Sequence, residues 1–338
     1  PIASSNRIFL NCGLRRPGRC VHRFMGPNAP LAGGLRYRSF VRRRFEPLLP
    51  DEPIGVVALS GPVEPGPLEA GLAVLRGWGQ PLVLAPNLDR RSGYLAGEDD
   101  ARIDGLEWVL ERGARTLIAA RGGYGVTRLL HRLPWDRLVD AGTRFVGYSD
   151  VTALMNALVT RGGGVQFHGP MVAAGLVNGR NSRQLRALLD GRLVGKALFR
   201  FPQSSVVRAG RTRGPALGGN LALITALLGT PFEPSFDGCV LFLEEVGEPL
   251  YRLDRMLTQL ASAGTFQRVK ALIGGSLRGC RPAGERTERW CELLRELAPP
   301  SAVIAVNLPF GHSARKLGFP IGPQVEVDSN SGLVTWCV

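Results

Sequence analysis

Residues 144–154, RFVGYSDVTAL, change from an apolar run to a helical pattern within a few residues. The first four residues are typical of a short buried strand, and the last four continue as a helix would. Ser149 lies at the junction, where a helix N-cap is expected, and Asp150 is an equally suitable cap. A serine on a sharp strand-to-helix turn is also typical of a nucleophile elbow. The second glycine of the GxSxG elbow pattern is absent, because Val151 stands there. The residues alone therefore leave both roles open for Ser149.

The same alternation of strand and helix extends upstream of this stretch. Strands are expected within 53–63, 81–86, 115–120 and 143–147, and helices within 68–79, 102–113 and 125–133. Strands that alternate with helices of about 10 to 15 residues indicate parallel pairing in a sheet covered on both faces. Residues 53–172 are therefore predicted to form an N-terminal α/β domain.

A second α/β domain is predicted at residues 205–338, after an arginine-rich crossing at 173–204. Helices are expected at 218–229, 248–264 and 286–298, and strands at 238–246, 269–276 and 301–309. The last residues, 324–338, alternate around an Asp/Ser/Asn/Gly turn and predict a β-hairpin. The second sheet is thus expected to have an antiparallel edge.

The basic character of the chain is concentrated at its N-terminus. The net charge is +14, yet the ten arginines before Phe45, with no acidic residue among them, leave only +4 for the rest. Because a nucleic-acid site should be a basic face of the folded domain, we expect no nucleic-acid partner. Residues 1–50 are predicted to be a disordered basic extension.

The sequence shows no pattern typical of a membrane span, a metal site or a disulfide framework. The uncharged run 214–232 is interrupted by glycine, proline and asparagine, so no membrane association is expected. The six cysteines form no CxxC pair and no metal-ligand spacing. Neither a zinc site nor a disulfide framework is therefore indicated, and we expect a reducing, cytoplasmic location.

A glycine-rich loop, RGGYG at 121–125, directly follows an expected strand. Ligands of open α/β sheets bind beyond the carboxyl ends of the strands. Three glycines in four positions let a ligand approach the backbone and leave N–H groups free for an oxyanion. The loop matches neither GxGxxG nor a P-loop, so a nucleotide loop is not indicated. A plain tight turn is the alternative.

A carboxylate pair and a histidine end two further strands. Glu244 and Glu245 follow an apolar run, and only one of them can point into the crevice, because neighbouring strand residues face opposite ways. His312 and His168 both lie in loops and are the candidate bases. Serine, carboxylate and histidine at strand ends are the set that acyl transfer requires, with the glycine loop as oxyanion donor.

These residues resemble the LD-carboxypeptidases, or murein tetrapeptide carboxypeptidases, a family that includes the microcin C immunity peptidases. The resemblance covers about residues 53–325 and is carried, in family order, by RGGYG (121–125), GYSD (147–150), TAL (152–154), FHGP (167–170), GGNL (218–221), LEEVGE (243–248), YRLDRML (251–257) and GH (311–312). One departure is Glu245, where aspartate is common in the family.

The resemblance implies a Ser149, Glu244 and His312 triad. It implies that the backbone N–H groups of Asp150 and of the loop at Gly123 form the oxyanion hole. It further implies two domains, with a class I glutamine amidotransferase-like or flavodoxin-like parallel sheet first and the active site between them. Members of the family typically form homodimers and need no metal or cofactor, so the resemblance implies a homodimer without either.

By this resemblance we expect a serine carboxypeptidase that removes the terminal D-alanine of murein tetrapeptide in cell-wall recycling. We expect the loop at Gly122 and Tyr124 to bind substrate, including part of its terminal carboxylate. The alternative enzyme cleaves aminoacyl- or peptidyl-nucleotides, as the immunity peptidases do. A catalytically inactive ligand-binding module is the non-enzymatic alternative.

Overall fold

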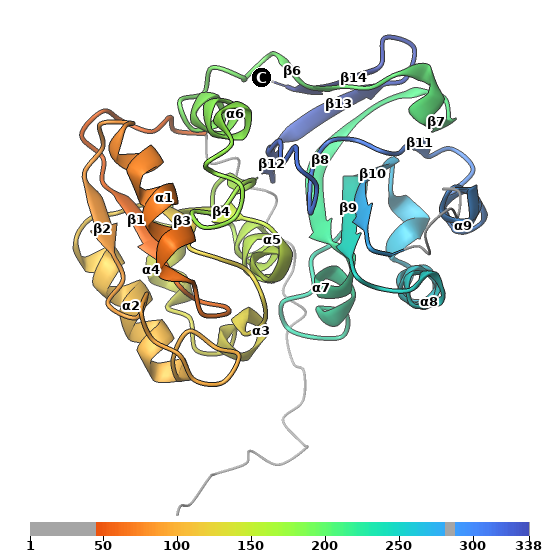
Figure 1. Cartoon of the computed structure of the whole chain (residues 1–338). Coiled ribbons are helices and arrows are strands. Elements are labelled where there is room, and N and C mark those ends of the chain that lie inside the picture. Colours follow the sequence, from red (N-terminus) through yellow and green to blue (C-terminus); the bar gives the residue numbers. More distant parts are fainter. Residues whose placement is uncertain (1–44, 281–287, 338) are drawn as a thin grey trace, which may run out of the picture. The chain divides into compact units, whose positions relative to one another are not determined.

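The computed structural model describes residues 45–280 and 288–337, all within one compact unit, Phe40–Val338 (Figure 1). The predicted N-terminal extension lies outside the described residues, apart from 45–50. Among the described residues, every helix is too short or too polar to cross a membrane.

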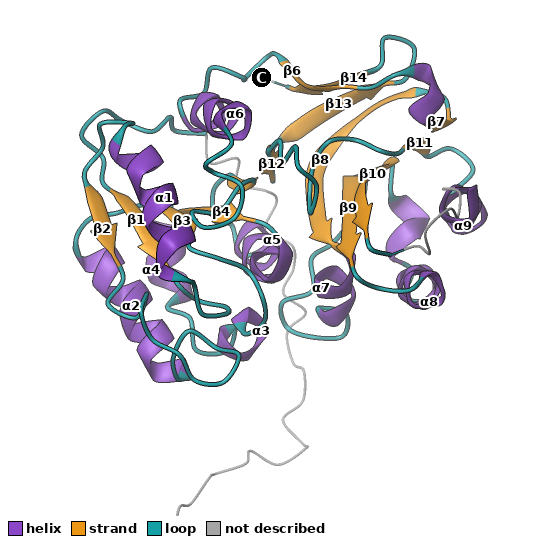
Figure 2. Cartoon of the chain, in the orientation of Figure 1, coloured by secondary structure: helices purple, strands orange, loops and turns teal. Residues whose placement is uncertain are grey.

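The first sheet has the strand order β12-β5-β4-β3-β1-β2. Figure 2 shows β4, β3, β1 and β2 next to one another in this order. Its strands are β1 (Ile54–Val57), β2 (Leu82–Leu84), β3 (Thr116–Ala119), β4 (Arg144–Gly147), β5 (Gln166–His168) and β12 (Phe319–Ile321). The five strands β1 to β5 pair in parallel, whereas β12 is antiparallel to β5. The helices that connect these strands are α1 (Pro65–Arg76), α2 (Asp99–Glu111), α3 (Val126–Leu129), α4 (Trp135–Asp140) and α5 (Thr152–Thr160).

The second sheet has the order β6-β14-β13-β8-β9-β10-β11-β7. Its strands are β6 (Ala197–Arg200), β7 (Val206–Arg208), β8 (Arg211–Asn220), β9 (Val240–Val246), β10 (Ala271–Arg278), β11 (Val303–Ala305), β13 (Gln324–Asp328) and β14 (Leu333–Trp336). Strands β8 to β11 are parallel, and the predicted C-terminal hairpin is the antiparallel pair β13 and β14. The remaining helices are α6 (Gly179–Leu189), α7 (Leu221–Ala226), α8 (Leu250–Ser262) and α9 (Glu288–Leu297). The predicted α/β fold class is confirmed: the first sheet is mainly parallel, with β12 as an antiparallel edge, and the second sheet has an antiparallel edge.

Several elements differ from the sequence-based expectation, among them β5, β6, β7 and α4, which were not expected. The helix expected from Gly218 begins at Leu221, because Gly218 to Asn220 complete strand β8 beside β9. The arginine-rich crossing contains helix α6, whose N-terminus is capped by the Asn178 side chain and whose Leu185, Leu188 and Leu189 are buried. Strand β12, with a proline as its middle residue, was not expected from the sequence.

Strand β12 and the loop before it connect the two sheets. The loop leaves β11 in the second sheet, carries His312, and enters β12 in the first sheet. Phe319 of β12 stacks on Phe242 of β9, with ring centroids 4.1 Å apart, and Phe310 packs edge-on against Phe319 at 5.3 Å. All three rings are fully buried. Burial of aromatic rings contributes strongly to core stability, so this contact fixes both ends of the His312 loop.

Candidate active site

Ser149 lies on a sharp turn between β4 and α5. A 3₁₀ turn, Ser149–Val151, follows Tyr148, and α5 begins immediately after it. Ser149 has a φ of 62°, in the left-handed region, which costs a non-glycine residue about 1 to 2 kcal/mol. Val151 occupies the N-cap of α5 and makes no side-chain cap. Backbone strain of this kind occurs at functional sites, and the elbow geometry is present although the second glycine of the motif is not.

Asp150 does not cap its own helix. It is fully buried, and its Oδ2 accepts a hydrogen bond of 2.9 Å from the N–H of Val126, the first residue of α3. Burial raises the pKa of Asp150, and hydrogen bonding to the Val126 backbone opposes that rise. The side chain next to Ser149 therefore fastens the end of the glycine loop.

The glycine loop approaches Ser149 closely. A Cβ atom on Gly122 would lie 3.0 Å from the Ser149 Cβ and 3.2 Å from its Oγ. Gly123 has a φ of 122°, and the N–H of Gly61 donates to the carbonyl of Gly122 at 3.1 Å. The Gly123 N–H has no acceptor among the described residues. The backbone of the loop thus lies close to Ser149 and offers an N–H donor without an acceptor among the described residues. A simple tight turn would require neither feature.

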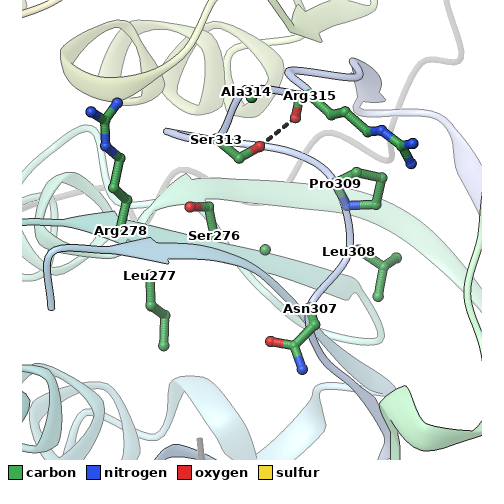
Figure 3. Close-up of a pocket in the computed structure, with 10 residues that line it drawn as sticks. Ser276, Leu277, Arg278, Asn307, Leu308, Pro309, Ser313, Ala314 and Arg315 are labelled. Atoms are coloured by element: carbon green, nitrogen blue, oxygen red, sulfur yellow. Dashed lines mark hydrogen bonds between the residues drawn. The ribbon is translucent and has the colours of Figure 1, made fainter. Parts of the chain in front are cut away.

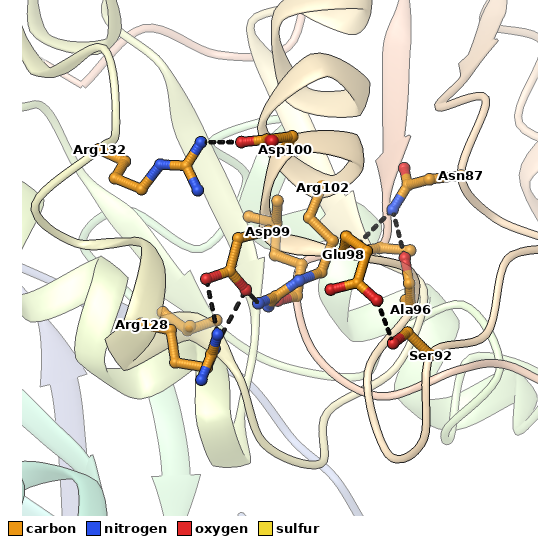
Figure 4. A network of polar contacts seen from close by, with 12 residues as sticks. Asn87, Ser92, Ala96, Glu98, Asp99, Asp100, Arg102, Arg128 and Arg132 are labelled. Atoms are coloured by element: carbon orange, nitrogen blue, oxygen red, sulfur yellow. Dashed lines mark hydrogen bonds and ion pairs between the residues drawn. The ribbon is translucent and has the colours of Figure 1, made fainter. Parts of the chain in front are cut away.

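A buried arginine supports the far end of this loop (Figure 4). The Arg102 side chain is fully buried, donates to the carbonyl of Leu59 and pairs with Asp99 at 2.5 Å. Asp99 also accepts from Arg128 of α3. Gly125 needs to be glycine here, because a Cβ would lie 2.4 Å from Arg102 Nη1. The sequence analysis missed Arg102, since nothing in the sequence distinguishes it from the exposed arginines.

Helix α5 is also fixed to the second sheet. The Asn156 side chain accepts from the Gly218 N–H at 2.9 Å and donates to the Gly218 carbonyl at 2.9 Å. The Thr152 hydroxyl accepts from the Asn220 N–H at 3.1 Å. Gly219 lies so close that a Cβ would meet Thr152 Oγ1 at 2.6 Å. The TAL and GGN motifs thus form the contact that positions Ser149 relative to β8 and β9.

Glu244 and Glu245 point in different directions. Glu245 accepts from the Asn220 side chain at 2.7 Å and from the Ala222 N–H, in the first turn of α7, at 2.8 Å. Glu244 Oε2 instead lies 2.7 Å from His312 Nδ1 and 3.2 Å from the His312 backbone N–H. The Glu244 side chain is fully buried. One carboxylate is therefore structural, and the other pairs with the histidine.

His312 is held in a tight loop. Gly311 has a φ of 82°, and a Cβ there would lie 2.4 Å from Glu244 Oε2, so a side chain at this position would displace the carboxylate. The His312 ring packs edge-on against Tyr148, with centroids 4.8 Å apart. Tyr148 directly precedes Ser149, so the histidine lies beside the elbow. Among the described residues, Ser149 and His312 form no direct hydrogen bond, and such bonds often tighten only with substrate present.

His168 was expected in a loop, but it ends strand β5 instead. It is fully buried, and neither ring nitrogen has a hydrogen-bond partner among the described residues. Its ring stacks on Phe319 with centroids 4.6 Å apart. Burial lowers the pKa of His168 to about 4. Of the two candidate bases, only His312 contacts a carboxylate.

A cavity adjoins the glycine loop. It has a volume of about 570 Å³ and is lined by Gly61, Pro62, Arg91, Gly93, Tyr94, Arg121, Gly123 and Tyr124. The rings of Tyr94 and Tyr124 lie 5.7 Å apart and are largely exposed. Within residues 45–280 and 288–337, no group of histidine, cysteine, aspartate and glutamate has the geometry to hold a metal ion.

Family models match both halves of the chain. The LD-carboxypeptidase N-terminal domain matches residues 54–169, and the LD-carboxypeptidase C-terminal domain matches residues 213–327. The chain belongs to the LD-carboxypeptidase family. It is accordingly a carboxypeptidase of this family of serine-type peptidases, and the resemblance found in its motifs is confirmed.

Relatives of known name are similar over most of their length. A putative carboxypeptidase of Streptomyces coelicolor is 41% identical, over 85% of this chain and 94% of the relative. The murein tetrapeptide carboxypeptidase of Pseudomonas aeruginosa is 31% identical, over 83% of this chain and 94% of that protein.

Solved structures of the family have the same two-domain fold. The muramoyltetrapeptide carboxypeptidase of Oxalobacter formigenes has a TM-score of 0.72 at 28% identity, over 83% of this chain and 97% of that one. MccF in complex with glutamyl sulfamoyl guanosine has a TM-score of 0.77 at 20% identity, over 86% of this chain and 96% of that one. At 20% identity, the similarity to MccF shows a shared fold and nothing more.

Proposed function

We propose that this LD-carboxypeptidase releases the terminal D-alanine from murein tetrapeptide through a Ser149, His312 and Glu244 triad. The main support is the pair of contacts from Glu244 to His312 beside a strained Ser149. The murein tetrapeptide carboxypeptidase of Pseudomonas aeruginosa, 31% identical, supports the substrate class.

The proposed reaction has two halves. A carboxylate accepts hydrogen bonds, so Glu244 favours the His312 tautomer with hydrogen on Nδ1 and leaves Nε2 as the base. His312 takes the proton of the Ser149 hydroxyl as Oγ attacks the carbonyl carbon of the diamino acid. His312 then gives that proton to the nitrogen of the leaving D-alanine. Water, deprotonated by His312, hydrolyses the acyl-enzyme and restores the Ser149 hydroxyl.

The oxyanion hole is proposed at the backbone N–H groups of Gly123 and Asp150. The Gly123 N–H is free within the described residues, and Asp150 lies in the first turn of a helical segment, where N–H groups lack helix acceptors. Gly122 gives substrate close access to Ser149, and Tyr124 lines the adjoining cavity. We assign both to substrate binding.

The test is direct. Purified protein is incubated with murein tetrapeptide, and D-alanine release is followed by mass spectrometry. The proposal predicts release by the wild type and none by Ser149→Ala. D-alanine release by Ser149→Ala at the wild-type rate would contradict the triad, and intact tetrapeptide after incubation with the wild type would contradict the substrate.

One observation favours a second candidate function, cleavage of aminoacyl- or peptidyl-nucleotides. The exposed Tyr94 and Tyr124 rings border the cavity beside Gly123 and offer a surface on which a base can stack. An aminoacyl sulfamoyl-adenylate added to the same assay distinguishes the two, because preferred cleavage of that compound favours this alternative.

We also propose a cytoplasmic homodimer that needs no metal, cofactor or nucleic acid. The family resemblance supports the dimer. The cysteines Cys239, Cys280 and Cys337 form no disulfide among the described residues, which fits a reducing compartment. Light scattering on the purified chain tests the dimer, and activity after dialysis against a chelator tests the independence from metal.

A further inference from the structure

A second cavity lies next to the loop that carries His312 (Figure 3). Its volume is about 430 Å³, and its walls include Ser276 and Arg278 of β10 and Ser313 and Arg315, which follow His312. This cavity lies at the carboxyl end of a parallel strand, where ligands of open α/β sheets bind.

The strand and the loop that form this cavity are bonded to each other. The Ser276 N–H donates to the Phe310 carbonyl at 3.1 Å, and the Leu308 N–H donates to the Gly274 carbonyl at 3.0 Å. Gly275 allows this approach, because a Cβ there would lie 2.6 Å from the Phe310 ring. The position of β10 side chains relative to the His312 loop is therefore fixed by the backbone.

Two polar side chains of β10 face the same way. Ser276 and Arg278 are two residues apart on the strand, and Figure 3 shows Leu277 pointing to the opposite side. Arg278 is exposed, and among the described residues its guanidinium forms no hydrogen bond or ion pair. A guanidinium is always charged and matches the geometry of a carboxylate. Arg278 is thus a cation at the edge of the cavity that is not paired with any residue in the part of the chain that the structure describes.

The charge of Arg278 acts on the groups around His312. Burial raises the pKa of Tyr148, and the Arg278 charge opposes that rise. Burial lowers the pKa of Lys316, and Arg278 lowers it further. Lys316 itself donates to the Ser313 carbonyl, and its Nζ lies 6.0 Å from the centre of the Tyr148 ring. Because Tyr148 contacts His312, Arg278 is close to the place where the leaving group departs.

We propose that this cavity binds the free carboxylate of the leaving amino acid, with Arg278 as its ion-pair partner and the Ser276 hydroxyl as a second donor. The assignment rests on the proposed function. In an amino-acid leaving group the carboxyl carbon is two bonds from the scissile nitrogen, and His312 protonates that nitrogen. The cation that recognises the carboxylate must therefore lie on the His312 side of Ser149, where β10 places Arg278.

Binding to the Ser149→Ala protein tests this assignment without turnover. Isothermal titration compares murein tetrapeptide with the same peptide ending in D-alanine amide. Charge-assisted hydrogen bonds to a carboxylate predict an acid preference of about 10- to 100-fold. Adding Arg278→Gln should reduce that preference to about twofold, while the amide is bound as before. The matched control is Arg255→Gln, which removes an equal charge from exposed α8 and should keep the preference.

Two outcomes would overturn the assignment: equal affinity for acid and amide in the Ser149→Ala protein, or an acid preference that survives Arg278→Gln. The assignment would also be overturned if Arg278→Gln reduced the affinity for an aminoacyl sulfamoyl-adenylate alone and left the affinity for the tetrapeptide unchanged. Turnover by the wild type is measured separately. An acid preference that depends on Arg278, without D-alanine release, would contradict the proposed function while supporting this site.

Discussion

Glu244 contacts His312 twice through one oxygen: Oε2 is 2.7 Å from the ring Nδ1 and 3.2 Å from the backbone N–H of the same residue. The ring and the backbone of His312 are thus both held by one buried carboxylate. This arrangement fixes the direction in which Nε2 points, and it depends on Gly311, whose missing side chain leaves room for the carboxylate.

Replacing Glu244 by Gln should strongly reduce catalysis and leave the fold intact. The amide keeps the shape of the side chain but loses the charge that stabilises the imidazolium, and it no longer enforces the tautomer. We expect kcat/KM for D-alanine release to fall by about 10² to 10⁴-fold, with an unchanged circular dichroism spectrum. The control is Glu245→Gln, which places an NH₂ group among N–H donors at the start of α7. Glu245→Gln should lower the free energy of unfolding more than it lowers kcat/KM. An equal loss of kcat/KM in both variants would contradict a structural role for Glu245 and a catalytic role for Glu244.

The strain at Ser149 predicts a stability difference between two inactive variants. Both Ser149→Ala and Ser149→Gly lack the hydroxyl, but only glycine adopts a φ of 62° without steric cost. The glycine variant should therefore unfold at higher denaturant concentration, with a free energy of unfolding about 1 kcal/mol above that of the alanine variant. Equal midpoints in urea would show that the left-handed conformation is not retained in solution.

Gly122 should matter for rate more than for stability. A methyl group at this position would lie 3.2 Å from Ser149 Oγ and occupy the approach to the nucleophile. We expect Gly122→Ala to lower kcat/KM by about 10²-fold, since a displacement of about 1 Å has that effect on a reacting geometry. Gly66→Ala is the matched control, because a Cβ there meets nothing within 4 Å. Full activity of Gly122→Ala would argue against substrate passing along this loop.

Local sequence patterns were enough to predict most of the fold. The face Ile103, Leu106, Val109 and Leu110 of α2 is buried as its spacing predicts. The hairpin at the C-terminus was visible because alternation and turn residues act over a few positions. Strand β12 was not visible, since its three residues are strand only because the His312 loop brings them beside β5.

The candidate site likewise contains residues that local sequence predicts and contacts that only the tertiary structure reveals. Residues at strand ends, such as Glu244 and His312, were predicted because parallel strands bring their carboxyl ends together. Their hydrogen bond, and the different direction of Glu245, depend on tertiary geometry. Asn156 carried no signal at all: a polar residue within α5 is ordinary, and only its two bonds to Gly218 reveal that it links the helix to the second sheet.

His168 should make stability depend on pH in the acidic range. Its pKa is lowered to about 4 in the folded protein, against a reference value of 6.5 for an exposed histidine. The unfolded chain therefore binds the proton more readily, and the contribution of the neutral buried ring is complete above pH 6.5. This contribution is lost as the pH falls from 6.5 to about 4 and amounts to roughly 3 kcal/mol over that window.

The measurement is urea unfolding of the wild type and of His168→Phe at several pH values between 4 and 7. Phenylalanine suits the aromatic surroundings of Phe319 and Tyr148 and does not titrate. Groups distant from His168 titrate equally in both proteins, so the difference between the two curves reports His168 together with its charge interactions with Glu244 and His312. That difference should shift in favour of the variant as the pH falls, and parallel curves would mean that His168 is solvated or paired in solution. His168 forms no hydrogen bond to Glu244. The His168→Phe variant should therefore still release D-alanine at pH 7.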